Sequence, residues 1–237
     1  MLATEGRVIM ISGANRGIGR AIAETLFEAG YSISLGARDP ESLSSVIDGR
    51  ATDRVATARY DAEDAKTHEH WVEATVEKFG RIDGLVNNAG IFESVTVEDG
   101  DDAVLDRMWA VNVKAPLSMT RLALPHLRRS GTGRIVNVAS LAGKVVFDSG
   151  IGYSMTKFAA VALSHATRHA GWKDGVRCTA LCPGYVATDL TSGVESITQD
   201  RMIPAGDLAQ VVLTVLSLSN SASIAELVIN CRDDPTA

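Results

Sequence analysis

The chain has 237 residues, of which 46% are hydrophobic and 22% are charged, and its formal net charge is −6. These values are typical of a folded globular protein, and the excess of acidic residues disfavours a nucleic-acid interface, which is usually basic. The start of the chain does not resemble a signal peptide, and no apolar run reaches the roughly 20 residues that a membrane span needs. Three cysteines form neither a disulfide framework nor a zinc motif. We therefore expect a cytoplasmic protein with no nucleic-acid partner and no membrane partner.

Short β-branched segments alternate with longer amphipathic segments along the whole chain. We expect strands at 7–12, 32–36, 55–60, 84–87, 134–140, 176–182 and 226–230. We expect helices at 17–30, 68–80, 101–129, 151–171 and 206–218. Apolar strands that alternate with helices predict a parallel sheet covered on both faces. The predicted fold is α/β, one Rossmann-type doubly wound parallel sheet of about seven strands with helices on both faces, formed by a single domain over residues 1–237.

A glycine-rich loop, SGANRGIG (12–19), follows the first expected strand and precedes a helix. Gly13, Gly17 and Gly19 allow a tight turn and let the backbone approach a pyrophosphate, while the helix N-terminus supplies free N–H groups. In this strand–loop–helix context the loop predicts dinucleotide binding, and a glycine-rich turn without a ligand is the alternative.

The end of the second expected strand bears on the choice of dinucleotide. NAD-binding proteins usually place an acidic residue there, to hold the ribose 2′-hydroxyl. Here the sequence reads LGARDP, with Arg38 at the expected position and Asp39 one residue later. Arg38 and Arg16 of the glycine-rich loop suit a 2′-phosphate. We predict NADP, and NAD is the alternative if the strand ends one residue later.

The segment GIGYSMTKFAAVALS (150–164) has the composition of a buried helix, but it contains a phenol and an ammonium group. Tyr153 and Lys157 are four residues apart, and such residues are neighbours on one helix face. A lysine cation beside a phenol lowers the phenol's pKa toward the range useful for acid–base catalysis. The alternative is a core tyrosine beside a lysine whose stem is buried and whose amine reaches water.

Taken together, these motifs resemble those of the short-chain dehydrogenase/reductase family, in its single-domain group, over essentially the whole chain. In chain order, the matching segments are SGANRGIG (12–19), YDAED (60–64), NNAG (87–90), MWAVNVKAP (108–116), IVNVAS (135–140), YSMTK (153–157) and PGYVATDL (183–190). Ser12 stands where the family commonly has threonine, which keeps the hydroxyl.

The resemblance implies a catalytic set of four residues. Tyr153 would protonate a carbonyl oxygen as hydride arrives from the nicotinamide, and Lys157 would tune that phenol and hold the nicotinamide ribose. Ser140 would donate a hydrogen bond to the substrate oxygen. Asn112 would hold a water that links Lys157 to bulk solvent.

The resemblance also implies the residues that bind the cofactor. Asp61 and Ala62 would contact the adenine, and for Asn88, as for Asn87, a purely structural role is the alternative. The full predicted set is Gly13, Asn15, Arg16, Gly17, Ile18, Gly19, Arg38, Asp61, Ala62, Asn88, Ala89, Gly90, Tyr153, Lys157, Pro183, Gly184, Val186 and Thr188.

The leading functional hypothesis is an NAD(P)-dependent oxidoreductase that interconverts a small-molecule carbonyl and an alcohol. A 3-oxoacyl-thioester reductase and a catalytically idle dinucleotide-binding regulator are the alternatives. Substrate choice is expected to depend on residues 91–94, on 141–147 and on a loop over 189–204. His165 and His169 lack a third ligand, so no metal site is predicted. The resemblance implies a homotetramer or a homodimer.

Overall fold

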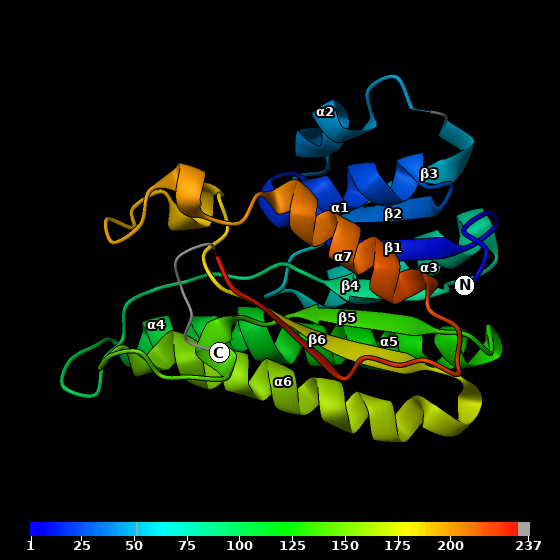
Figure 1. Cartoon of the computed structure of the whole chain (residues 1–237). Coiled ribbons are helices and arrows are strands. Elements are labelled where there is room, and N and C mark those ends of the chain that lie inside the picture. Colours follow the sequence, from blue (N-terminus) through cyan, green and yellow to red (C-terminus); the bar gives the residue numbers. More distant parts are fainter. Residues whose placement is uncertain (51, 232–237) are drawn as a thin grey trace.

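The computed structural model describes residues 1–50 and 52–231 of the chain. At its centre is one seven-stranded sheet in the order β3-β2-β1-β4-β5-β6-β7, with every neighbouring pair parallel (Figure 1). The strands are β1 (Val8–Ser12), β2 (Ser32–Ala37), β3 (Val55–Arg59), β4 (Gly84–Asn87), β5 (Arg134–Val138), β6 (Arg177–Pro183) and β7 (Glu226–Ile229). The strand order reverses between β1 and β4, which places the switch point of the doubly wound sheet between their carboxyl ends. The predicted fold class is confirmed.

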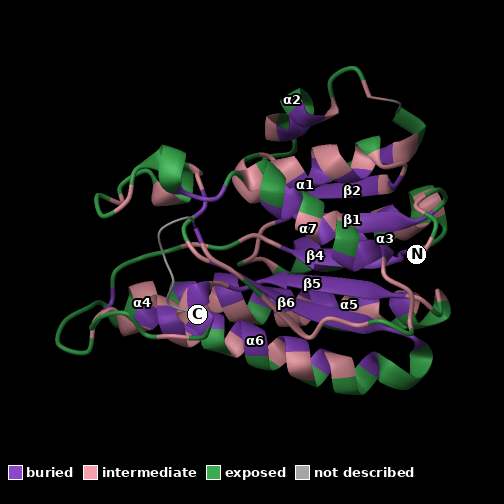
Figure 2. Cartoon of the chain, viewed as in Figure 1, coloured by how far each residue is buried: buried purple, intermediate pink, exposed green. Residues whose placement is uncertain are grey.

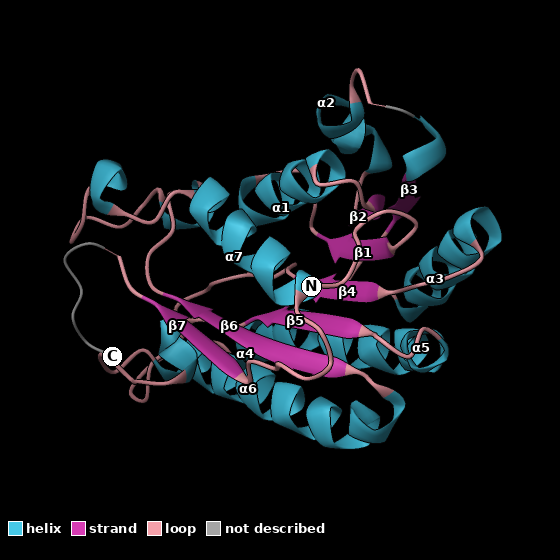
Figure 3. Cartoon of the chain, turned by 45° about the vertical axis from the view of Figure 1, so that its right-hand side comes forward, coloured by secondary structure: helices cyan, strands magenta, loops and turns pink. Residues whose placement is uncertain are grey.

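Helices cover both faces of the sheet (Figure 3). On one face, α1 (Gly17–Glu28) and α7 (Ala205–Ser217) pack against the strands through an apolar cluster that includes Leu26 and Leu216. On the other face lie α3 (Ala65–Phe79), α5 (Ala115–Arg129) and α6 (Ile151–Gly171), with Trp71 in the core between α3 and the sheet. The strands β1, β5 and β6 between these layers are entirely buried, whereas the edge strands β3 and β7 are partly exposed (Figure 2).

The helix expected over 101–129 is three consecutive segments instead of one. They are α4 (Asp102–Trp109), a π-helical segment (Ala110–Lys114) and α5. Pro116 explains the interruption, because its nitrogen carries no hydrogen and cannot donate to the carbonyl of Asn112 four residues earlier. The short helix α2 (Ser44–Ile47) was not predicted, since its one turn is too short for a periodic pattern.

Buried arginines line the edge of the sheet where the strands begin. Arg134 is 2% exposed, and it donates to the carbonyls of Gly175 (3.3 Å) and Leu218 (2.6 Å), the latter just after α7. Arg177 donates to the carbonyl of Trp172 (3.1 Å), just after α6. The last carbonyls of a helix lack intrahelical donors and carry partial negative charge, so these guanidiniums cap the helix ends. Burial lowers the pKa of Arg134 to about 10, which leaves it charged at neutral pH.

Replacing Arg134 by methionine tests this capping. Arg134→Met removes the guanidinium donor from the carbonyls of Gly175 and Leu218, so we expect a loss of about 3 kcal/mol in the free energy of unfolding. Urea unfolding followed by circular dichroism measures it. Arg121→Met, at an exposed position of α5, is the matched control and should change that free energy by less than about 0.5 kcal/mol. Equal stability of both variants would contradict the capping role.

Candidate active site

A large pocket, about 970 Å³ in volume, opens at the carboxyl ends of the strands. Loops that follow β1, β2, β3, β4, β5 and β6 all contribute to its lining, together with the start of α6. The pocket brings together all of the predicted cofactor residues except Gly19, and it includes the predicted catalytic residues Ser140, Tyr153 and Lys157. Asn112 lies behind the lining.

The glycine-rich loop sits tightly against the loop that follows β4. A Cβ atom on Gly19 would lie 2.2 Å from the carbonyl oxygen of Gly13 and 2.5 Å from Nδ2 of Asn88, so only glycine fits there. The Ser12 hydroxyl accepts hydrogen bonds from the backbone N–H groups of Asn88 (3.0 Å) and Ala89 (3.1 Å). Gly19 therefore packs the two loops together and does not line the pocket.

The two asparagines after β4 differ in their surroundings. Asn87 is buried and donates to Oδ1 of Asn137 (2.8 Å), which joins β4 to β5. Asn88 donates to the carbonyl of Ser12 (2.9 Å) and also lines the pocket. The structural interpretation therefore holds for Asn87, whereas Asn88 supports the glycine-rich loop and remains available to a ligand.

The N-terminus of α1 is open toward the pocket. Its N-cap residue, Arg16, makes no capping hydrogen bond with its side chain, and the first turn contains no acidic residue. Gly17 and Ile18 of this turn line the pocket. Free N–H groups at the positive end of a helix are suited to phosphate oxygens. The site therefore fits the pyrophosphate of a dinucleotide.

The residues after β2 have distinct partners. The strand ends at Ala37, and Arg38 follows it directly with its side chain in the pocket lining. The Asp39 carboxylate accepts from the N–H of Glu41 (3.0 Å) and caps the short 3₁₀ turn Pro40–Leu43. Arg16 lies 3.1 Å from Asp189, but both side chains are largely exposed, so this pair contributes little to stability.

Tyr153 lies in the first turn of α6 and faces Ser140, which follows β5. Burial raises the pKa of Tyr153 to about 12, and the hydrogen bond with Ser140 lowers it by a smaller amount. The Ser140 hydroxyl also accepts from the N–H of Ala142 (3.1 Å), which fixes its orientation. We expected Lys157 to lower the pKa of Tyr153. The structure gives the opposite direction, because burial dominates.

Lys157 is buried one turn further along α6. Its ammonium nitrogen donates to the carbonyl of Val138 (2.9 Å) and lies 5.4 Å from the centroid of the Tyr153 ring. Burial lowers the pKa of Lys157 to about 8. The alternative of an amine that extends to water is wrong, because Lys157 is only 6% exposed.

Asn112 connects the loop after β4 to α6. Its Oδ1 accepts from the N–H of Ile91 (2.9 Å), and its Nδ2 donates to the carbonyl of Ile91 (2.9 Å) and to the hydroxyl of Thr156 (3.1 Å). Both amide atoms are therefore engaged by the protein. In this structure the side chain holds residue 91 against the helix that carries Tyr153 and Lys157.

The end of the pocket beyond Tyr153 is lined by residues from all three predicted substrate segments. Phe92 packs edge-on against the Tyr153 ring, with centroids 5.2 Å apart. Arg107, which forms an ion pair with Glu63 (3.4 Å), and Tyr185 also line the pocket and were not predicted. Arg107 lies outside the segments singled out for the substrate, so no sequence signal placed it here, whereas Tyr185 lies within the segment PGYVATDL (183–190) that carries the family resemblance.

His165 and Lys144 both contact the carboxylate of Glu226. His165 hydrogen-bonds to Glu226 (2.6 Å), and Lys144 pairs with the other oxygen of the same carboxylate (2.5 Å), which joins α6 and the segment after Ser140 to β7.

Within residues 1–50 and 52–231, no three His, Cys, Asp or Glu side chains are grouped so as to hold a metal ion. In the same ranges, no helix is both long enough and apolar enough to cross a bilayer.

Comparison with known proteins agrees with this geometry. The sequence profile of the short chain dehydrogenase family matches residues 7–198. The chain belongs to this family. Agropine synthesis reductase from Rhizobium rhizogenes is 45% identical over 228 residues, which is 96% of this chain and 53% of that protein. The chain therefore spans about half the length of that relative.

Solved structures of similar fold cover nearly the whole of this short-chain dehydrogenase. An alcohol dehydrogenase from the archaeon Thermococcus sibiricus, complexed with 5-hydroxy-NADP, has a TM-score of 0.88 and 27% identity, over 98% of this chain and 99% of that one. A 3-ketoacyl-(acyl-carrier-protein) reductase from Brucella melitensis, complexed with NADH, has a TM-score of 0.87 and 27% identity, over 96% and 97%. Enzymes of this fold thus include complexes with both kinds of dinucleotide.

The contact at Gly19 gives a prediction for this short-chain dehydrogenase. Gly19→Ala forces the loops after β1 and β4 apart, so we expect a loss of about 1–3 kcal/mol in the free energy of unfolding and weaker NADPH binding. Urea unfolding and fluorescence titration measure the two effects. Gly206→Ala, in the first turn of α7 with no atom within 4 Å of the added Cβ, is the control and should be neutral or slightly stabilising. Wild-type behaviour of Gly19→Ala would refute the packing argument.

Proposed function

We propose that the chain is an NADP-dependent oxidoreductase that interconverts a carbonyl and an alcohol by hydride transfer. The observation that carries this proposal is the grouping of three residues in one pocket. Tyr153, Ser140 and Lys157 line the same pocket, and the Lys157 ammonium lies 5.4 Å from the phenol ring centroid. A bound nicotinamide dinucleotide supplies the hydride in this chemistry.

Tyr153 acts as the general acid in the reductive direction. A phenol whose pKa is about 12 is protonated at neutral pH, and it can give that proton to the more basic alkoxide that forms from a carbonyl. Ser140 donates a hydrogen bond to the same oxygen and fixes the substrate beside Tyr153. Lys157, still mostly charged at neutral pH, holds the nicotinamide ribose and stabilises negative charge on the phenol.

Asn112 acts through its contacts. Its amide holds residue 91, and it bonds to Thr156, the neighbour of Lys157 in α6. Pro116 removes the α-helical donor for the backbone carbonyl of Asn112, so this carbonyl is the group we assign to the relay water.

The preference for NADP follows from the residues after β2. Arg38 lines the pocket where an acidic residue would hold a ribose 2′-hydroxyl, and Asp39, which also lines it, uses one carboxylate oxygen to cap the next turn. Among residues 1–50 and 52–231, the partner of the Arg16 side chain is the exposed carboxylate of Asp189, so Arg16 can turn toward a 2′-phosphate. The NADP-type ligand of the archaeal alcohol dehydrogenase supports this choice, while the NADH complex of the Brucella enzyme keeps NAD as the alternative.

A 3-oxoacyl-thioester reductase is the second candidate function, because the Brucella carrier-protein reductase has a similar fold. Such a substrate calls for basic residues at the pocket mouth. Arg128 of the Arg128–Arg129 pair instead contacts Ala170 and Asp174 at the far end of α6 from Tyr153. Arg107 and Lys144 are paired with carboxylates. We therefore favour a small uncharged carbonyl or alcohol, and we carry over from the family a cytoplasmic homotetramer or homodimer.

The first test removes the proton that Tyr153 donates. Tyr153→Phe should lower kcat/KM for carbonyl reduction by about 10³-fold, the contribution typical of a general acid. The NADPH dissociation constant, measured by fluorescence on the same preparation, should stay close to the wild-type value. Retained turnover in Tyr153→Phe would exclude the proposed mechanism, and wild-type protein that binds neither NADPH nor NADH would exclude the function.

The second test concerns cofactor choice. Arg38→Ala removes a charge-assisted hydrogen bond to the 2′-phosphate, so NADPH affinity should fall by about 10–100-fold. NADH affinity should hardly change, since NADH lacks that phosphate, and it serves as the internal control. If titrations show equal losses for both dinucleotides, Arg38 does not read the 2′-phosphate.

A further inference from the structure

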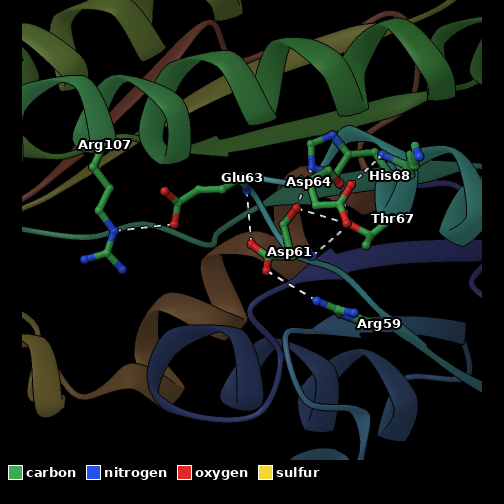
Figure 4. Close-up of polar contacts among 8 residues, drawn as sticks. Arg59, Asp61, Glu63, Asp64, Thr67, His68 and Arg107 are labelled. Carbon is green, nitrogen blue, oxygen red and sulfur yellow. Dashed lines mark hydrogen bonds and ion pairs between the residues drawn. The ribbon is translucent and has the colours of Figure 1, made fainter. Parts of the chain in front are cut away.

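The turn between β3 and α3 forms one end of the pocket, the end that the proposed function assigns to adenosine. Asp61 and Ala62 of this turn line the pocket. The turn is held from behind by the first residues of α3 (Figure 4). The Thr67 hydroxyl accepts from the N–H of Asp61 (2.9 Å) and lies 2.7 Å from the carbonyl oxygen of Asp64. A second side chain of α3, His68, contacts the carbonyl oxygen of Asp61, which also lies 3.1 Å from the Thr67 hydroxyl.

His68 joins three elements through its two ring nitrogens. Nε2 lies 2.9 Å from the carbonyl oxygen of Asp61, and Nδ1 lies 3.0 Å from the hydroxyl of Ser118 on α5. A carbonyl oxygen can only accept, so Nε2 carries the hydrogen. In the neutral ring Nδ1 is then an acceptor, and the Ser118 hydroxyl donates to it. Each nitrogen thus has one partner of the complementary kind.

The surroundings keep this ring neutral. His68 is 2% exposed, and burial lowers its pKa, against the raising influence of the Asp61 carbonyl and of the carboxylates of Asp64, Asp61 and Glu69. The ring of Tyr60 packs against it with centroids 5.0 Å apart, and burial raises the pKa of that phenol, so it too is uncharged. From α5 the ring meets the uncharged hydroxyl of Ser118.

We propose that His68 is a positioning residue for the adenosine end of the cofactor. Its Nε2–H group fixes the carbonyl of Asp61, and its bond to Ser118 fixes the ring, so residues 61–62 are held at the pocket before the cofactor arrives. This inference rests on the proposed function, because it assigns the turn to adenosine. Pre-ordering a contact turn strengthens binding by reducing the entropy lost on association.

The two nitrogens of His68 allow a matched pair of substitutions. A glutamine amide reaches about as far as Nε2 and keeps a donor for Asp61, whereas an asparagine amide reaches only about as far as Nδ1 and keeps the Ser118 partner. Both substitutions remove the imidazole ring and its packing. If His68 only joins α3 to α5, His68→Asn should therefore keep more of the wild-type affinity than His68→Gln. If His68 positions the Asp61 carbonyl, His68→Gln should keep more.

The experiment measures dissociation constants for NADPH and NADH by fluorescence in the full chain. We expect His68→Asn to raise both dissociation constants about tenfold, which corresponds to the loss of one buried hydrogen bond. His68→Gln should restore most of the lost affinity. kcat at saturating NADPH should stay near the wild-type value. Activity with reduced nicotinamide mononucleotide, which lacks adenosine, should not change. His70→Asn, at an exposed position of the same helix, is the control and should behave as wild type.

Three results would overturn the inference while leaving the proposed function intact. They are wild-type affinity in His68→Asn, an equal loss in His68→Gln, or a parallel loss with the mononucleotide. Failure of the wild-type protein to bind either dinucleotide removes the proposed function, and this inference with it. If His68→Asn does not fold, Ser118→Ala provides the test. Ser118→Ala leaves the His68 ring in place and should weaken NADPH binding about threefold. Unchanged NADPH affinity in this variant would also refute the inference.

Discussion

The close contact between the loops after β1 and β4 is the constraint on which the rest of the site depends. These strands are neighbours only because the strand order reverses between them. Their loops then meet through the Ser12 hydroxyl, the Asn88 amide and the missing Cβ of Gly19. This contact places the open N-terminus of α1 beside the segment that Asn112 holds against α6. The end proposed to bind phosphate and the end that carries Tyr153 and Lys157 thereby line one pocket.

The polarity of the helices divides the molecule into two chemically different edges. At the pocket edge, α1 begins without a side-chain cap, so its partial positive charge is left for a ligand. At the opposite edge, Arg134 and Arg177 bind the carbonyls that follow α7 and α6. These arginines cap the C-terminal ends of the protein's own helices. Arg128 lies at the same edge, where it contacts the carbonyl of Ala170 and the carboxylate of Asp174.

Contiguous motifs were the part of the site that sequence could predict. The segments 12–19 and 153–157 each contain the residues and the spacing that their chemistry needs, and nearly all of the predicted cofactor residues line one pocket. Tertiary proximity was not predictable in this way. Nothing in the sequence brings Ser118 to His68, and spacing alone suggested that Lys157 would set the pKa of Tyr153. Burial, which depends on the whole fold, is the largest influence on that pKa and raises it.

Burial acts on the two acid–base groups in opposite directions and for the same reason. It disfavours charge, so it raises the pKa of Tyr153 to about 12 and lowers that of Lys157 to about 8. Both shifts favour the state in which the phenol keeps its proton. In the mechanism proposed above, carbonyl reduction takes a proton from this phenol, whereas alcohol oxidation needs the phenol to lose its proton first. A raised phenol pKa therefore suits the reductive direction of the proposed reaction.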